Sequence, residues 1–414
     1  MVRSLPGEIP PPPRTTTKET AVLEAPLTKG LSITKEEELH WLALRLIPGL
    51  GTRKANQLLD RLKTPQAIFR ASRSELEASG LSGSVAQTIA SGCTFDDAVD
   101  QQQKMLEAGA YLVPFNDPAY PARLKEIFDP PIALFVRGSR VELLQAILLG
   151  VVGTRRPTPY GTAATERLAA DLAQAGLTIT SGMARGIDTS AHRAALDIGG
   201  DTVAVLGCGV DLVYPAENRK LAAEIAAKGL MVSEFPMGSP AYPQNFPIRN
   251  RIISGMSVGV LVVEGAQYSG SAITAKMALD QQREVFAVPG SIMSKMSWGP
   301  NLLIKQGAKL VQEWNDVLVE LPSDIRRALI GKAQARLGVM SLELNGEEAT
   351  LPPELGVASR VLFNKLKPDI PIHIDELIET SDTLTSSEVI AALFELELLG
   401  LARQLPGKNF VKVW

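Results

Sequence analysis

Short apolar runs alternate with amphipathic stretches along the middle of the chain, between residues 146 and 322. The runs have the length of strands and are apolar on both faces, which is typical of strands buried in a parallel sheet. They cover residues 147–152, 177–180, 202–206, 230–233, 258–263 and 284–288. Helical spacing fits the segments between them, which are 160–175, 188–198, 215–228 and 270–282. The alternation predicts an α/β domain built on a doubly wound parallel sheet.

A different pattern precedes this domain. Leu39, Leu42 and Leu46 recur at helical spacing, and residues 36–108 are therefore predicted to form a small all-α domain. Residues 1–35 are rich in proline, threonine and charge and have no periodicity, so we expect a disordered tail there. Residues 111–138 contain turn signals and are interpreted as a connector that leads the α/β domain, which we place at 109–322.

The pattern changes again after the α/β domain. Residues 323–350 are interpreted as a linker with some helical propensity, and residues 351–414 as a further small domain. In that domain helical periods end at Gly400, and two strand-like segments then flank the turn pair Pro406-Gly407. Two helices followed by a hairpin predict a winged helix.

Composition narrows the function classes. The chain has 414 residues, 45% of them apolar and 21% charged, which is typical of globular proteins. A net charge of −3 excludes a globally basic nucleic-acid binder but leaves room for a local basic patch. Two distant cysteines and three scattered histidines predict neither a disulfide framework nor a metal site, and we expect no cofactor. The first residues have no apolar signal core and no run reaches membrane-spanning length, so we expect a cytoplasmic protein without a membrane segment.

Glycine-rich loops follow four of the predicted strands, starting at Gly153, Ser181, Gly207 and Glu264. The carboxyl ends of parallel strands meet at one edge of the sheet, where ligands bind in open α/β folds. Glycine allows close backbone approach, and the N–H groups at a helix start attract anions. Arginines in or near the loops add charge at the same edge, and the last loop opens a helix. Together these features predict a site for a phosphate-bearing ligand, built from Arg155, Arg156, Arg185, Arg249, Arg251, Ser269, Gly270 and Ser271.

Structural interpretations of the same residues stay open. A single glycine turn after a strand is often only a turn, and Asp188 can simply cap its helix. Tyr160 and Phe246 can belong to the core, and His192 fits packing better than a role as a base. No P-loop motif occurs, and Gly207-Cys208-Gly209 lacks the third glycine of a dinucleotide fingerprint. No serine, histidine and aspartate trio has supporting local context.

Long stretches of these loops resemble the DprA/Smf DNA-processing family. The resemblance covers at least residues 146–320 in colinear order, through SGMARGIDTSAH at 181–192, GCGVDLVYPAEN at 207–218, SEFPMGSPAYPQNFPIRNRIISGMS at 233–257 and SGSAITAKMALDQQREVFAVPG at 269–290. It implies a Rossmann-like core flanked by an N-terminal helical domain of the sterile-alpha-motif type and a C-terminal winged helix. One small departure is Gly265, where the family more often has alanine.

The resemblance also implies a function. Members of the family bind single-stranded DNA through its backbone phosphates, protect it and load the RecA recombinase during natural transformation. They act as homodimers through the Rossmann-like domain, without catalysis or a cofactor. The matching phosphate-binding positions, of which Lys220 is the weaker one, are Arg155, Ser181, Gly182, Arg185, Gly186, Lys220, Arg249 and Arg251. Tyr242 and Phe246 are candidates for base stacking, with core packing as the alternative.

Two other functions are weighed against this one. A nucleotide-binding Rossmann enzyme, such as a nucleoside-monophosphate phosphoribohydrolase, has a similar rim but uses a PGGxGTxxE loop with a catalytic glutamate. The matching stretch here, residues 288–292, lacks the second glycine, the threonine and the glutamate. A structural adaptor with a vestigial site is disfavoured because Arg155, Arg249 and Arg251 occur together.

The flanking domains carry opposite charge. Residues 45–73 hold seven basic residues and one acidic residue, and their turn resembles a helix-hairpin-helix that contacts DNA through Gly49, Gly51, Arg53 and Lys54. A tight turn without a ligand is the alternative. Residues 351–414 hold six basic and nine acidic residues, and Glu395 and Glu397 lie on or near the candidate recognition helix. This charge favours a protein contact or a regulatory role for the winged helix over groove binding.

Overall fold

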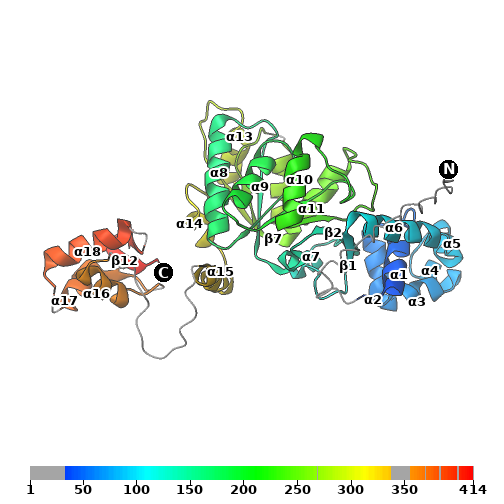
Figure 1. The fold of residues 1–414 in the computed structure, drawn as a ribbon, viewed down its shortest axis with the longest axis horizontal. Helices are drawn as coiled ribbons and strands as arrows, with labels where there is room; N and C mark the ends of the chain where they lie inside the picture. The colour runs from blue at the N-terminus through cyan, green and yellow to red at the C-terminus, as the bar shows by residue number, and fades with distance from the viewer. Residues whose placement is uncertain are drawn as a thin grey trace, which may run out of the picture.

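The computed structural model describes residues 33–267, 269–336, 355–368, 370–381, 384–398 and 401–413 (Figure 1). Almost all of the tail predicted at 1–35, and residues 337–350 of the predicted linker, lie outside the described residues. Residues 323–336 of that linker form helix α15 (Ser323–Arg336).

The described residues contain a nine-stranded sheet with the order β1-β2-β6-β5-β4-β3-β7-β8-β9. All neighbours from β6 to β9 are parallel. The chain enters the sheet's centre at β3, adds β4, β5 and β6 on one side, and then crosses to add β7, β8 and β9 on the other. This confirms the predicted doubly wound sheet, whose parallel strands are β3 (Leu148–Val152), β4 (Thr178–Ser181), β5 (Thr202–Val205), β6 (Leu230–Ser233), β7 (Ser257–Val262), β8 (Glu284–Ala287) and β9 (Lys309–Leu310).

Two further strands lie in the segment that was interpreted as a connector. β1 (Ala110–Pro114) and β2 (Ala133–Gly138) pair antiparallel, and β2 pairs antiparallel with β6. The turn signals at 116–118 and 129–131 fall between the two strands, and for this reason the whole segment was interpreted as a connector. Short helices α7 (Ala122–Lys125) and η1 (Val141–Gln145) complete this region.

Helices cover both faces of the sheet because each parallel strand is apolar on both sides. In β3, Leu149 and Val151 pack toward α8, α9 and α15, whereas Leu148 and Val152 pack toward α7, α11 and α12. The remaining helices follow the strands in the predicted alternation. Their bounds are α8 (Pro159–Gln174), α9 (Ile187–Asp197), η2 (Ala216–Asn218), α10 (Arg219–Lys228), α11 (Asn245–Met256), α12 (Gly270–Asp280), α13 (Trp298–Lys305) and α14 (Asn315–Leu318).

The N-terminal region is helical, as predicted, and packs against the sheet domain (Figure 1). One apolar cluster runs without interruption from Trp41 and Leu58 in this region to Phe135, Met231 and Met237 in the sheet domain. Its helices are α1 (Lys35–Arg45), α2 (Thr52–Leu62), α3 (Pro65–Arg70), α4 (Arg73–Ala78), α5 (Gly83–Ser91) and α6 (Phe95–Ala108).

A buried amide joins the same two domains. Gln101 on α6 donates to the Met237 carbonyl (3.3 Å) and accepts from the Met237 N–H (2.8 Å). Both partners are buried, so neither group has water as an alternative.

The C-terminal domain has its own apolar core and the predicted winged-helix pattern. Its small sheet has the order β10-β12-β11, and the predicted hairpin is β11 with β12. Glu395, which was expected to repel DNA, accepts hydrogen bonds from Ser359 and from the Gly356 N–H inside the domain. The elements are α16 (Val357–Lys365), β10 (Ile372–His373), α17 (Ile374–Glu379), α18 (Ser386–Leu398), β11 (Ala402–Leu405) and β12 (Asn409–Lys412).

Within the described ranges, none of the helices is both long and apolar enough to span a membrane.

Stability of the sheet domain depends on pH through one buried histidine. His192 on α9 is fully buried, and burial lowers its pKa from the ordinary 6.5 to about 3. Its Nδ1 lies 2.7 Å from Thr202 Oγ1, whose hydroxyl donates to the Ile179 carbonyl, so Nδ1 is the donor in this pair. The lowered pKa keeps the ring neutral at pH 7. Below pH 6.5 the unfolded chain therefore binds a proton that the folded chain does not.

We expect the free energy of unfolding to fall by about 2 kcal/mol between pH 7 and pH 5 through this residue alone. His192→Asn keeps a polar atom toward Thr202 and cannot charge, so its unfolding free energy should depend less on pH by that amount. Urea unfolding of both proteins at the two pH values measures the difference. Equal pH dependence in the two proteins would contradict the assignment.

Candidate functional site

The candidate site lies where the carboxyl ends of the central strands meet. β3 leads into α8 on one face of the sheet, and its neighbour β7 leads into α12 on the other. The strand order reverses at this pair, and open α/β sheets bind ligands in the crevice that results. The glycine-rich loops singled out in the sequence surround it.

Arg249 on α11 forms the buried base of the site. It is 4% exposed, and its Nη1 donates to the carbonyls of Gly182 and Val205, both at 2.5 Å. Burial lowers its pKa, an effect opposed by the nearby Asp188 carboxylate. Arg249 therefore ties the loop after β4 to the end of β5 and is not free at the surface.

The Asp188 carboxylate, in the first turn of α9, interacts electrostatically with the Arg249 guanidinium. Its Oδ2 accepts from the N–H groups of Gly182 (3.1 Å) and Ala184 (3.4 Å), so the carboxylate organises the same loop. Burial raises the pKa of Asp188, and the Arg249 guanidinium opposes that rise. Asp188 does not cap α9, whose N-cap residue is Gly186; its carboxylate instead braces the loop that precedes the helix.

Glycine is required at both ends of this loop. A Cβ on Gly182 would overlap the Arg249 guanidinium. Gly186 has a φ of +75°, and a Cβ there would come within 2.5 Å of the Thr154 carbonyl oxygen. The loops after β3 and β4 can approach each other only because Gly186 lacks a side chain, and Arg249 can lie against the loop after β4 only because Gly182 lacks one.

An exposed arginine and two aromatic rings form the surface of the site. The Arg155 guanidinium lies 5.3 Å from the centroid of the Phe246 ring. Tyr214 packs against Phe246, with 5.5 Å between the two ring centroids, and is 45% exposed. A small cavity beside them is lined by Arg155, Gly182, Ala184, Arg185, Tyr214, Pro215 and Phe246.

Tyr214 was not among the site residues predicted from the sequence. It lies in the Val213-Tyr214-Pro215 turn, directly after the third glycine-rich loop, so an aromatic residue at this place was available as a signal. Phe246, for which core packing was the alternative, is half-buried, and the Arg155 guanidinium lies over its ring. Tyr242 is 52% exposed and lies outside the cavity.

Other predicted cations also lie at the surface. Arg156 and Lys220 are exposed, and Arg185 pairs with Glu217 through Nη2 and Oε2 at 2.8 Å. Both partners of that pair are more than half exposed, so the pair contributes little stability and can open to a ligand.

The predicted serines have mostly internal roles. Ser181 is fully buried and donates to the Val151 carbonyl at 2.6 Å. Ser271 is 4% exposed and lies 2.7 Å from the hydroxyl of Ser269, which caps α12. Gly270, the first residue of α12, is exposed. Of the three residues predicted here, Ser269 and Gly270 are therefore at the surface and Ser271 is not.

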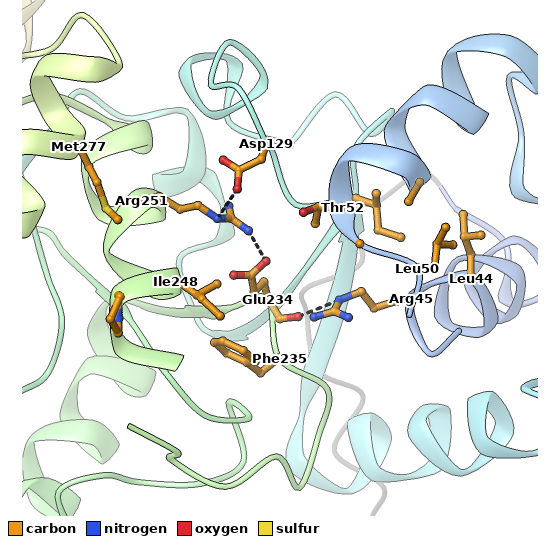
Figure 2. A pocket seen from close by; sticks show the side chains of 14 residues that line it. Leu44, Arg45, Leu50, Thr52, Asp129, Glu234, Phe235, Ile248, Arg251 and Met277 are labelled. Carbon is orange, nitrogen blue, oxygen red and sulfur yellow. Dashed lines mark hydrogen bonds and ion pairs between the residues drawn. The ribbon is translucent and has the colours of Figure 1, made fainter. Parts of the chain in front are cut away.

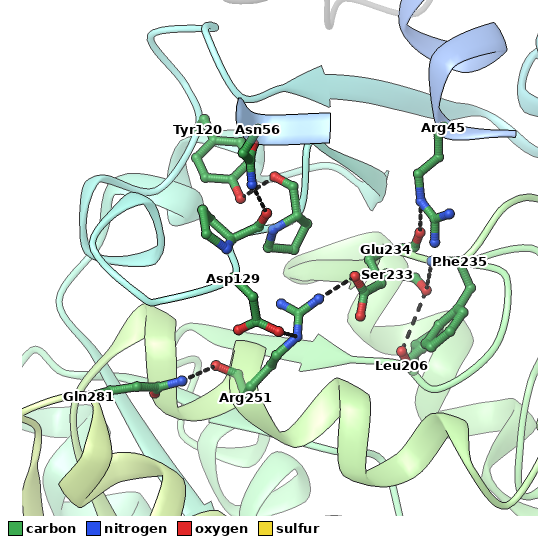
Figure 3. A network of polar contacts seen from close by, with 12 residues as sticks. Arg45, Asn56, Tyr120, Asp129, Leu206, Ser233, Glu234, Phe235, Arg251 and Gln281 are labelled. Atoms are coloured by element: carbon green, nitrogen blue, oxygen red, sulfur yellow. Dashed lines mark hydrogen bonds and ion pairs between the residues drawn. The ribbon is translucent and has the colours of Figure 1, made fainter. Parts of the chain in front are cut away.

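Arg251 is not part of the group around Arg155. It is 7% exposed and pairs with Glu234 (Nη2 to Oε2, 2.5 Å) and Asp129 (Nε to Oδ2, 3.3 Å), in the polar network of Figure 3. The two arginines of this run thus occupy separate places: Arg249 under the rim and Arg251 near the helical domain.

The helix-hairpin-helix turn is formed as expected, with a φ of +77° at Gly49 and Gly51 as the residue before α2. Arg53 lies over the ring of Phe128, 4.3 Å from its centroid, and Lys54 is exposed. Gly51 and Thr52 line a cleft that faces the sheet domain. The predicted DNA contact of this turn stays a prediction.

Comparisons with known proteins identify the family to which the chain is similar. The family model of DNA recombination-mediator protein A matches residues 111–322, and that of the DprA winged helix domain matches residues 345–408. The chain is 34% identical to Protein Smf of Synechocystis over 399 residues, covering 90% of this chain and 98% of the relative. It is 44% identical to DNA processing protein DprA of Bacillus subtilis over 216 residues, covering 52% of this chain and 73% of the relative.

Among solved structures, the X-ray structure of DNA processing protein A from Streptococcus pneumoniae aligns with a TM-score of 0.59 at 34% identity. That alignment covers 70% of this chain and 99% of the other. A structure titled for the single-stranded DNA binding mode of the Helicobacter pylori protein aligns with a TM-score of 0.47 at 30% identity, covering 54% and 96%.

Proposed function

We propose that this chain, which belongs to the DNA recombination-mediator protein A family, binds single-stranded DNA, protects it and loads the RecA recombinase onto it during natural transformation. The observation that carries the proposal is the exposed group of Arg155, Phe246 and Tyr214 at the carboxyl edge of the sheet. A cation beside two rings matches the two parts of a single strand, its phosphates and its unpaired bases.

Phosphates meet several donors at this edge. Arg155, Arg156, Arg185 and Lys220 present exposed cations. Guanidinium forks suit phosphate oxygens, and such contacts carry no sequence information. Binding should therefore depend strongly on salt and weakly on sequence.

Bases meet the aromatic group. Phe246 is held by its packing against Tyr214 and Arg155, while Tyr214 keeps almost half of its surface exposed. A base stacked on such a ring gains about 1–3 kcal/mol regardless of its identity.

The carboxylates at the rim favour binding over catalysis. Glu264 is 1% exposed and accepts from the Thr158 N–H (2.8 Å) and hydroxyl (2.6 Å), while Asp188 braces the loop after β4. Both are thus engaged in holding loops, and residues 288–292 lack the catalytic glutamate of the phosphoribohydrolases. Hydrolysis of nucleoside monophosphates by the purified protein would favour that enzyme instead.

The homodimer and the RecA contact are proposed from the family. Because loading of RecA onto DNA takes place in the cytoplasm, we expect this protein to act there. The sheet ends at β9, a two-residue strand where Leu310 is 44% exposed, and the preceding α13 begins with Trp298, which is 40% exposed. An exposed apolar edge of this kind suits a second copy of the chain.

Arg155→Ala tests the phosphate contact. We expect weaker binding to every single strand and a salt dependence of log Kd that is shallower by about 0.7, because one phosphate contact is lost. Fluorescence anisotropy with labelled dT, dA and mixed strands across a salt series measures both. Arg167→Ala, an exposed arginine along α8, is the matched control and should bind like wild type. A loss confined to one sequence would contradict the phosphate assignment.

Tyr214 tests the stacking contact. Tyr214→Ala should weaken single-strand binding about 5- to 150-fold, since one stacked base is lost, with little change in salt dependence. Tyr214→Phe keeps the ring and should bind within about twofold of wild type. The same anisotropy titration compares the three proteins. Equal affinity of Tyr214→Ala and wild type would show that no base stacks there.

Leu310→Asp tests the assembly. Light scattering coupled to size exclusion should find a dimer for wild type and a monomer for the variant, because a carboxylate would have to be buried in the interface. RecA filament assembly on strands coated with single-strand-binding protein should accelerate with wild type and less with the monomer. A wild-type monomer at all concentrations would contradict the homodimer.

A further inference from the structure

Phe128 is an exposed aromatic residue in the segment between α7 and β2, outside the small cavity beside Arg155. The residue is 78% exposed, although Ile127 and Pro130 on either side of it are buried. The ring therefore adds little to the core and projects from a segment that is otherwise part of the interior.

Hydrogen bonds fix the segment that carries Phe128. Asn56 on α2 donates from its amide to the Pro130 carbonyl at 2.8 Å, and the buried Tyr120 hydroxyl donates to the Pro131 carbonyl at 2.7 Å (Figure 3). The ring is thus held in place relative to both the helical domain and the sheet domain. A partner that packs on it does not have to order a loop first, which lowers the cost of binding.

Arg53, in the first turn of α2, places a cation over this ring. Its guanidinium carbon lies 4.3 Å from the ring centroid, closer than the 5.3 Å between Arg155 and Phe246 at the rim. Arg53 and Lys54 are both exposed, and neither forms an ion pair within the described part of the chain. A guanidinium can lie over a ring and still offer its N–H groups to a phosphate. Arg53 and Phe128 therefore repeat the cation-and-ring arrangement of the rim.

The acidic residues beside Phe128 are already paired. Glu126 Oε2 lies 3.0 Å from Arg283 Nη2, and Asp129 Oδ2 lies 3.3 Å from Arg251 Nε. On the other side of the ring, α2 carries three basic residues against one acidic residue. The charge left over at this place is positive, which favours an anionic partner.

A cleft joins this place to the rim. Thr52 and Asp129, the neighbour of Phe128, line it on the side of the helical domain, and Ile248 lines it on the side of the sheet domain (Figure 2). Ile248 is 42% exposed and belongs, like Phe246, to the first turn of α11. The path from the rim to Phe128 therefore passes over the start of α11 and along the cleft.

We propose that Arg53, Lys54 and Phe128 form a second contact for the single strand that is bound at the rim. A base stacks on Phe128, and phosphates meet Arg53 and Lys54. This inference rests on the proposed function, because it extends the strand bound there. Stacking on a phenyl ring accepts every base, so the second contact is as independent of sequence as the first.

Two contacts on one strand predict a dependence on strand length. Once a strand is bound at the rim, its far end meets Phe128 at a high effective concentration. The affinity should therefore rise sharply at the length that first spans both contacts, and short strands should depend on the rim alone.

Phe128→Ala tests the stacked base, with fluorescence anisotropy of dT strands from about 6 to about 30 nucleotides. The variant should bind the shortest strands like wild type and the long strands about 5- to 150-fold more weakly. Phe128→Tyr keeps the ring and should bind every length within about twofold of wild type. Leu106→Ala, which removes a similarly exposed apolar side chain from α6 (71% against 78%), is the matched control and should bind every length like wild type.

Arg53→Gln tests the cation. The salt dependence of log Kd for long strands should become shallower by about 0.7, while that for the shortest strands stays unchanged. Arg73→Gln, at an exposed arginine that pairs with Glu77 on α4, should bind like wild type. Arg155→Ala weakens short and long strands alike, so loss of the rim contact and loss of the second contact have different signatures.

Photocrosslinking locates the strand directly. A long dT strand that carries 5-iodouracil should label the rim at Tyr214 or Phe246 and also the tryptic peptide 126–137, which contains Phe128. Labelling of the rim alone would overturn the inference and leave the proposed function standing, as would wild-type binding of Phe128→Ala at every length. A change of oligomeric state in Phe128→Ala with unchanged strand binding would assign the ring to a protein contact instead. A wild-type protein that binds no strand would overturn both proposals.

Discussion

Everything at the rim depends on one guanidinium buried under it. Burying a charge is costly unless it is paired and hydrogen-bonded, and Arg249 meets that condition through two carbonyls and the Asp188 carboxylate. The carbonyls belong to the ends of adjacent strands, so the guanidinium holds the loops after β4 and β5 at a set separation. Arg185 and Tyr214, which we propose to contact DNA, stand on those loops, whereas Arg155 follows β3 and Phe246 lies on α11 beside Arg249 itself.

A single turn of α11 serves two separate places. Arg249 supports the rim, and Arg251, two residues later, anchors the network between the helical and sheet domains. Residues two apart on a helix point in different directions, which lets one segment organise both. The FPIRNR run therefore has two structural roles, one under the rim and one between the domains, although its sequence suggests a single cluster of positive charge.

The parallel strands and the helices between them were predictable because their apolar patterns are strong and repeated. β1 and β2 were not predictable, because the proline-rich turns around them resemble a connector. These strands pair antiparallel, so they also lack the long crossover helix that signals a parallel strand. At the site, glycines and arginines were predictable by type. Which arginines are buried was not, because burial depends on carbonyls from strands that are distant in sequence. Tyr214 was missed for the same reason: only the fold brings it against Phe246.

The apolar cluster shared by the helical region and the sheet domain has a consequence for how the chain folds. Residues such as Phe135 and Met237 belong to the interior only while α1 to α6 cover them, so the two domains must gain and lose structure cooperatively. The winged helix buries an apolar core made of its own residues. We therefore expect two folding units, the helical region with the sheet domain and the winged helix by itself, and we expect removal of the winged helix to leave the rest folded.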